Sequence, residues 1–243
     1  MFTLFKKEIS GFFSSLTGYI VVFVFLLINS LFLWIFPGDM NVLESGYADL
    51  TALFTISPWV FLFLVPAVTM RLFSDEKKAG TIELLLTRPL TDLQIVLAKY
   101  FAGLALVLLS LLPSLIYFLS VYLLGNPVGS IDSGGTWGSY IGLFFLAAIY
   151  VAIGIFSSSL TENQIVAFIF GMLICFIFYT GFESIASLHL IKGSDDFIVN
   201  LGINEHYKSM SRGVIDSRDM VYYLAVITVF IFSTKTVLES RKW

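Results

Sequence analysis

The chain has 243 residues, of which 58% are hydrophobic, 16% aromatic and only 13% charged, and its formal net charge is −3 at pH 7. This composition, with a mean hydropathy of +0.91, lies outside the range of ordinary soluble domains. We therefore expect an integral membrane protein that is surrounded by a lipid bilayer and has no nucleic-acid partner.

An amphipathic helix is predicted at residues 2–16, ahead of the first long apolar run. Apolar side chains recur at helical spacing from Phe2 to Leu16, while Lys6 and Lys7 fall on the other side. A helix with these two faces is expected to lie in the membrane interface. We call this segment the elbow helix, and its candidate functional residues are Phe5, Lys6, Lys7 and Glu8.

Long apolar runs predict six transmembrane helices. A hydrocarbon core about 30 Å thick needs roughly 20 apolar residues in a helix. Runs of about this length lie at residues 17–36, 52–70, 100–124, 138–160, 165–182 and 220–238. Because the runs lack the alternation of transmembrane strands, the predicted fold class is all-α, with one transmembrane domain over residues 1–243. Pro58, Pro66 and Pro113 lie inside these runs and are expected to produce kinks or hinges.

A charged and amphipathic segment at residues 74–90 separates the second and third runs. Ser74 is expected to cap a short helix, and Gly80 to permit a break in it. An apolar stripe at i, i+3 and i+4 spacing follows, formed by Ile82, Leu85 and Leu86, with Glu83 on the opposite face. Pro89 ends this helix. The sequence from Thr91 to Gln94 is a capping box that starts the next helix.

The distribution of Lys and Arg predicts the orientation. With the N-terminus inside, ten of these residues fall in cytoplasmic segments and four in outer segments. The predicted outer loops 37–51 and 125–137 contain neither residue type. The positive-inside rule therefore places both termini and the 74–90 segment in the cytoplasm.

The largest polar region, residues 183–219, is then expected to lie outside. It is too short for an independent domain of usual size, and we expect short helices that cap the outer mouth of the bundle. Glu183, at the outer end of the fifth run, is either a candidate outer gate or a marker of the membrane interface.

The residues of the 74–90 segment resemble a known pattern. Asp75 precedes a sequence of the form E-x-x-x-G-T-x-E-x-L-L-x-x-x-P, with a small shift in spacing at its end, and Lys99 follows at the start of the third run. The matching positions are Glu76, Gly80, Thr81, Glu83, Leu85, Leu86 and Pro89. This segment resembles the coupling-helix region of ABC-2 type transporter permeases. The segments 5–9 and 212–224 are similar to that family's elbow helix and to the entry of its sixth span.

The resemblance implies a permease subunit in the inner membrane of a bacterium. A separate cytoplasmic ABC ATPase would dock on the helix within Asp75–Pro89 and would bind ATP and Mg²⁺, so that this chain itself holds no cofactor. The subunit would work with a second copy or with a related membrane subunit. Within the family, the chain most resembles permeases of gliding-motility ABC transporters.

Motifs for other chemistry are absent from the sequence. It contains no G-x-x-x-x-G-K-[ST] phosphate loop, no H-E-x-x-H and no G-x-S-x-G. The two histidines, His189 and His206, form no metal-binding motif, so no catalytic residue and no metal ligand is assigned. A membrane scaffold that recruits a cytoplasmic partner through the 74–90 helix, without any transport, remains the alternative function.

The predicted orientation can be tested by cysteine labelling from outside the cell. In a Cys175→Ser background, we expect a membrane-impermeant maleimide to modify Asp196→Cys and to spare Lys78→Cys. The opposite labelling pattern would overturn the orientation.

Overall fold

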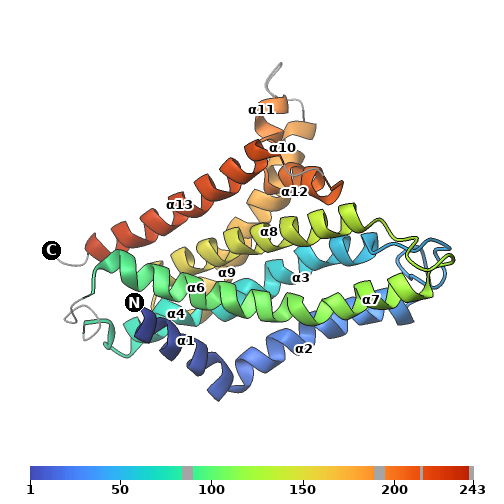
Figure 1. Ribbon diagram of the computed structural model, residues 1–243. Coiled ribbons are helices and arrows are strands. Elements are labelled where there is room, and N and C mark those ends of the chain that lie inside the picture. Colours follow the sequence, from blue (N-terminus) through green and yellow to red (C-terminus); the bar gives the residue numbers. More distant parts are fainter. Residues whose placement is uncertain (84–89, 189–194, 214–215, 241–243) are drawn as a thin grey trace.

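The computed structural model describes residues 1–83, 90–188, 195–213 and 216–240, and these residues form helices and connecting loops without strands. Figure 1 shows the arrangement. The helices before residue 90 are α1 (Phe2–Ser14), α2 (Leu16–Ser30), η1 (Leu31–Ile35), α3 (Thr51–Thr69) and α4 (Arg71–Lys78). Those that follow are α6 (Asp92–Leu111), η2 (Leu112–Ser114), α7 (Leu115–Leu124), α8 (Ser133–Leu160), α9 (Gln164–Phe176), η3 (Ile177–Gly181), α10 (Phe182–Ser187), α11 (Asp195–Val199), α12 (Ile203–Ser211) and α13 (Ser217–Glu239).

Six helical runs in the described parts of the chain are long and apolar enough to cross a membrane. They are Leu16–Ile35, Thr51–Lys78, Asp92–Leu124, Ser133–Leu160, Gln164–Ser187 and Ser217–Glu239. Each coincides with one of the apolar runs in the sequence, which confirms the all-α fold with six spans. The elbow helix is confirmed as α1, which an extended Ser15 separates from α2.

Helix α8 is the centre of the bundle. It packs against α3, α6, α9, α12 and α13. In its 18-residue apolar stretch, 78% of the residues are buried, compared with 22% in the corresponding stretch of the span that begins with α9. The difference means that α8 is surrounded by protein, whereas the span Gln164–Ser187 presents most of its surface outward.

The bundle has two distinct ends (Figure 1). At one end, called here the elbow end, lie α1, α4, the start of α6 and the end of α13. At the other, the cap end, lie α10, α11 and α12 together with the start of α8. The first and last helices of the chain therefore share one end, as an even number of spans requires.

Two local predictions about the 74–90 segment have different outcomes. The capping box is confirmed, because Thr91 accepts a hydrogen bond from the Gln94 backbone and Gln94 bonds back to Thr91. The expected cap at Ser74 is wrong. Ser74 lies inside α4, which continues the second span, and its hydroxyl donates to the Met70 carbonyl four residues earlier. A serine inside a helix can bond to the carbonyl four residues earlier, although serine is favoured at N-caps, and here the helix continues through Ser74.

The contact between α3 and α8 depends on Gly154. A Cβ atom at this position would overlap the side chain of Thr69, which is buried on α3. We predict that Gly154→Ala lowers the unfolding free energy by about 1–3 kcal/mol, because the two helices must separate to admit the methyl group.

Gly11→Ala is the matched control for this substitution. Gly11 lies on the exposed side of α1, and its added methyl group meets no atom within 4 Å. Since alanine favours a helix over glycine, this variant should be neutral or slightly more stable. Equilibrium unfolding in mixed detergent micelles measures both variants, and equal effects would contradict the packing argument.

Candidate functional site

A fully buried lysine joins three segments at the elbow end. Lys99 lies in the second turn of α6, and its side chain is 1% exposed. Its Nζ atom lies 3.1 Å from Oε1 of Glu8 on α1 and 3.0 Å from Oε1 of Glu76 on α4. Nζ also donates to the Leu72 carbonyl at 2.6 Å. The ammonium group thus donates hydrogen bonds to Glu8 and Leu72 and forms an ion pair with Glu76.

A second lysine completes the cluster. Nζ of Lys7 lies 3.5 Å from Glu8 and 3.3 Å from Glu76, so two lysines face two glutamates. Burial lowers the pKa of Lys7, but the two carboxylates raise it by more, and the pKa lies above its usual value. We call Lys7, Glu8, Glu76 and Lys99 the elbow-end charge cluster.

Three members of the charge cluster, Glu8, Glu76 and Lys99, are shielded from water, whereas Lys7 lies at its exposed edge. Removing ionised groups from water costs several kcal/mol each, and only close pairing compensates for this cost. Oε2 of Glu76 is buried without a partner among the described residues, so the cluster is not optimised for stability alone. Because each charge requires its partners, the cluster fixes how α1, α4 and α6 are placed relative to one another.

A second set of polar contacts fastens α4 to the end of α8. The Ser158 hydroxyl accepts hydrogen bonds from the backbone N–H groups of Phe73 at 3.0 Å and Ser74 at 3.1 Å. The same hydroxyl donates to the Met70 carbonyl at 2.7 Å. One buried serine of α8 thus bonds to three backbone groups at the junction of α3 and α4.

Two further charged side chains of α4, Asp75 and Lys77, also point into the protein. Lys77 donates to the backbone carbonyl of Ser159, and Asp75 accepts from the side chain of Gln164 at the start of α9. Helix α4 is therefore held on one side by α1 and α6 and on the other by α8 and α9.

The structure gives different surroundings to the residues predicted as the ATPase contact. Asp75 and Glu76 make internal contacts, as described above. Gly80 has a φ of +68°, which glycine adopts at little cost, and it ends α4. Thr81 and Glu83 are exposed, whereas Ile82 is buried at 8% exposure. The remaining predicted positions, Leu85, Leu86 and Pro89, lie outside the described residues.

The elbow residues and Glu183 are also placed by the structure. Phe5 is half-buried and Lys6 is exposed, and neither belongs to the charge cluster that contains their neighbours Lys7 and Glu8. Glu183 lies in α10 at the cap end and pairs with Lys208 at 3.0 Å. It also accepts a hydrogen bond from Asn204 at 2.7 Å, so it links α10 to α12.

Sequence reasoning missed the two residues that matter most for the position of α4. The sequence places Lys99 only at the start of the third run, although a charge at the edge of an apolar helix is a signal for a buried partner. Ser158 belongs to the run Ser157–Ser159, and all three of these serines are buried at the end of α8. A polar run at that position indicates hydrogen bonding to a neighbouring helix end.

Comparison with known proteins agrees with this architecture. The model of the family described as ABC-2 family transporter protein matches residues 44–234, which is most of the chain. The chain therefore belongs to the ABC-2 transporter family. A search of curated proteins finds no match.

Family membership defines the general role of the chain. It is a multi-pass membrane protein and the permease subunit of an ABC transporter. Permeases of this family are membrane components rather than catalysts, and ATP is hydrolysed by a separate ABC ATPase subunit.

Lys99→Met tests the charge cluster. The substitution keeps an unbranched side chain of similar length but removes the buried cation, so that Glu8 and Glu76 retain only the exposed Lys7 as a partner. We predict that it lowers the unfolding free energy by about 3–5 kcal/mol. Equilibrium unfolding in mixed micelles measures the effect.

Lys235→Met serves as the control, because Lys235 also pairs with a glutamate, Glu239, at 3.3 Å. This pair is substantially exposed, so its loss should cost about 1 kcal/mol or less. If Lys99→Met proved as mild as Lys235→Met, the cluster would not be holding the three segments together.

Proposed function

We propose that the elbow end couples this permease to its ATPase. The observation that carries the proposal is the double attachment of α4, through the charge cluster to α1 and α6 and through Ser158 to α8. Helix α4 continues α3 directly, so a force applied just beyond α4 acts on the elbow helix and on three spans, those that contain α3, α6 and α8.

The ATPase would dock on the segment that follows α4, within the predicted contact region 74–90. Since Asp75, Glu76 and Ile82 have internal contacts, the docking surface consists of Thr81, Glu83 and the stripe residues Leu85 and Leu86. The internal residues have a different task in this proposal. They transmit the movement of the docked segment to α1, α6 and α8.

The proposed orientation follows from this role. The ATPase is cytoplasmic, so the elbow end and both termini face the cytoplasm of a bacterium, and the membrane is the inner membrane. ATP and Mg²⁺ bind to the ATPase and no cofactor binds to this chain. The Lys and Arg distribution supports the same orientation.

The functional unit proposed here contains two membrane subunits, either two copies of this chain or one copy with a related subunit. The span Gln164–Ser187 supports such a contact, because only 22% of the residues in its apolar stretch are buried and the rest face outward. The resemblance in the sequence supports gliding motility as the process that uses this transporter. Cap-end Glu183 acts in this proposal as an outer gate, because its partners Asn204 and Lys208 hold α12 in place.

Substitution of the apolar stripe tests the docking proposal. We predict that Leu85→Ala combined with Leu86→Ala reduces the amount of co-purifying ATPase roughly ten- to hundredfold, because interface leucines carry more binding energy than rim charges. Glu83→Gln should weaken recruitment by about 1 kcal/mol or less. Both are measured at equal membrane abundance of the permease.

Leu123→Ala combined with Leu124→Ala is the matched control. These leucines are also adjacent in the sequence, and they lie exposed at the end of α7, at the cap end. Recruitment by this control should be unchanged. Undiminished recruitment by the Leu85 and Leu86 variant would refute the docking site, and ATPase recruitment without any effect on ATP hydrolysis would favour the scaffold function instead.

A further inference from the structure

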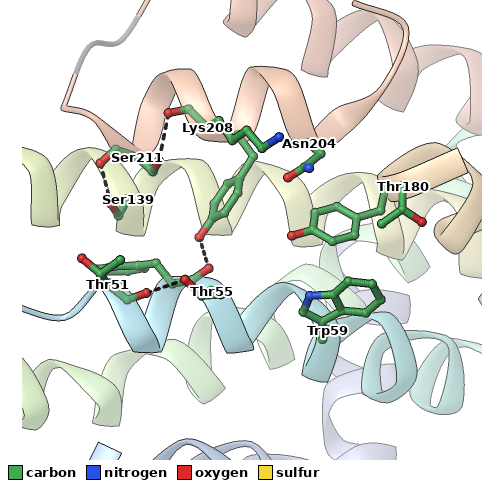
Figure 2. Close-up of a pocket in the computed structure, with 11 residues that line it drawn as sticks. Thr51, Thr55, Trp59, Ser139, Thr180, Asn204, Lys208 and Ser211 are labelled. Carbon is green, nitrogen blue, oxygen red and sulfur yellow. Dashed lines mark hydrogen bonds between the residues drawn. The ribbon is translucent and has the colours of Figure 1, made fainter. Parts of the chain in front are cut away.

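A cavity of about 340 Å³ with both polar and apolar walls lies at the cap end, between α3, α8, η3 and α12. Figure 2 shows hydroxyl and amide groups on its walls, contributed by Thr51, Thr55, Ser139, Thr180, Asn204 and Ser211. The volume is in the range of small-molecule sites. Such a concentration of polar groups is unusual in a bundle of apolar helices, where each polar group is costly unless it has a partner.

The walls of the cavity are fixed by hydrogen bonds between elements. Pro58 has no N–H group, so the Phe54 carbonyl four residues earlier lacks its helical donor. The Tyr207 hydroxyl of α12 donates to this carbonyl at 2.8 Å. In addition, Ser139 of α8 donates to the Ser211 carbonyl at 3.2 Å. The cavity is therefore preformed rather than dependent on a ligand for its shape.

Two aromatic residues supply unused hydrogen-bond donors to the cavity. Trp59 and Tyr179 pack edge to face, with ring centroids 5.4 Å apart. Among the described residues, none forms a hydrogen bond with the Tyr179 hydroxyl or with the Trp59 indole N–H. Tyr179 and Thr180 belong to η3, a π-helical turn, and such turns are frequent at functional sites because they redirect side chains.

The charge at the cavity is balanced. Lys208 lines it, but its ammonium group pairs with Glu183 at 3.0 Å, and Asn204 also bonds to Glu183. An anionic ligand would compete with Glu183 for Lys208. A cationic ligand would be repelled by the ammonium group of Lys208. The remaining wall groups are neutral donors and acceptors beside an aromatic ring.

We propose that this cavity binds a neutral, hydroxyl-rich group, such as a sugar ring, of the molecule that the transporter moves. A sugar ring presents C–H groups to the Trp59 ring and hydroxyls to the surrounding threonines, serines and Tyr179, which is the combination that the walls offer. The proposal rests on the proposed transport function. The sugar belongs either to a soluble saccharide or to the head group of a glycolipid that enters from the bilayer.

Binding can be measured with Trp59 as the reporter. Trp34→Phe, Trp137→Phe and Trp243→Phe leave Trp59 as the one tryptophan in the full-length chain, which is reconstituted in phosphatidylethanolamine nanodiscs without ATPase. One arm titrates maltotriose from solution, and a second incorporates diglucosyl diacylglycerol. We expect a saturable change in Trp59 emission in at least one arm, and the responding arm identifies the source of the sugar.

A third arm and three variants define what would overturn the proposal. Phosphatidylglycerol, which supplies an anionic head group, should give no saturable change. Thr55→Val and Tyr179→Phe each remove one hydroxyl and should weaken binding about two- to tenfold. Thr228→Val is the control, because Thr228, like Thr55, is an exposed threonine bonded to the carbonyl four residues earlier, but it lies on α13 away from the cavity.

No response to either sugar probe would refute the proposal, as would an equal response to phosphatidylglycerol or unaltered binding in both cavity variants. An equal loss in Thr228→Val would refute the assigned site. Because the titration contains no ATPase, its failure leaves the docking proposal at the elbow end intact. Conversely, loss of ATPase recruitment by the stripe variant says nothing against sugar binding.

Discussion

The ammonium group of Lys99 has to find three acceptors in a place that water does not reach. It finds them on α1 and α4, through Glu8, Glu76 and the Leu72 carbonyl, while Lys99 itself belongs to α6. A buried charge without partners lowers the stability of the folded protein strongly, because its lost hydration is not replaced. This requirement makes the arrangement of the elbow helix, the end of the second span and the start of the third span nearly obligatory.

The two ends of the bundle solve different physical problems around the same central helix. At the elbow end, α8 supplies the buried Ser158 hydroxyl, which accepts hydrogen bonds from the backbone of α4, and the result is a closed, polar joint. At the cap end, the same helix supplies Ser139 to α12 and leaves a cavity beside it. A rigid joint at one end and an open, hydroxyl-lined space at the other suit a protein that receives force on one side and handles a ligand on the other.

Much of the architecture is readable from the sequence because the information is local. Membrane spans follow from runs of apolar residues, and the capping box at Thr91 follows from two residues three positions apart. The elbow helix is likewise visible from the spacing of its apolar side chains. Each of these features is decided by neighbours within a few residues.

The contacts that define the candidate sites are not local and could not be predicted in this way. Glu8 and Lys99 are 91 residues apart, and the cavity combines four separate elements. Asp75 and Glu76 look in the sequence like solvent-facing charges, and only the packing of α1, α6 and α9 against α4 shows that they point inward. The predicted cap at Ser74 is wrong because the second span continues as helix through this residue, and its hydroxyl bonds to the Met70 carbonyl instead.

The central claim is that α1 and α4 move as one body when the ATPase acts. Spin labels at Lys6→Cys and Lys78→Cys, both exposed positions, report the distance between these helices in a Cys175→Ser background. The labelled chain is diluted with unlabelled copies and studied in the complex with its ATPase, with ATP hydrolysis verified in the same sample. We predict the same narrow distance distribution in the nucleotide-free and ATP-bound states. A distribution that shifts or broadens when ATP binds would contradict the account.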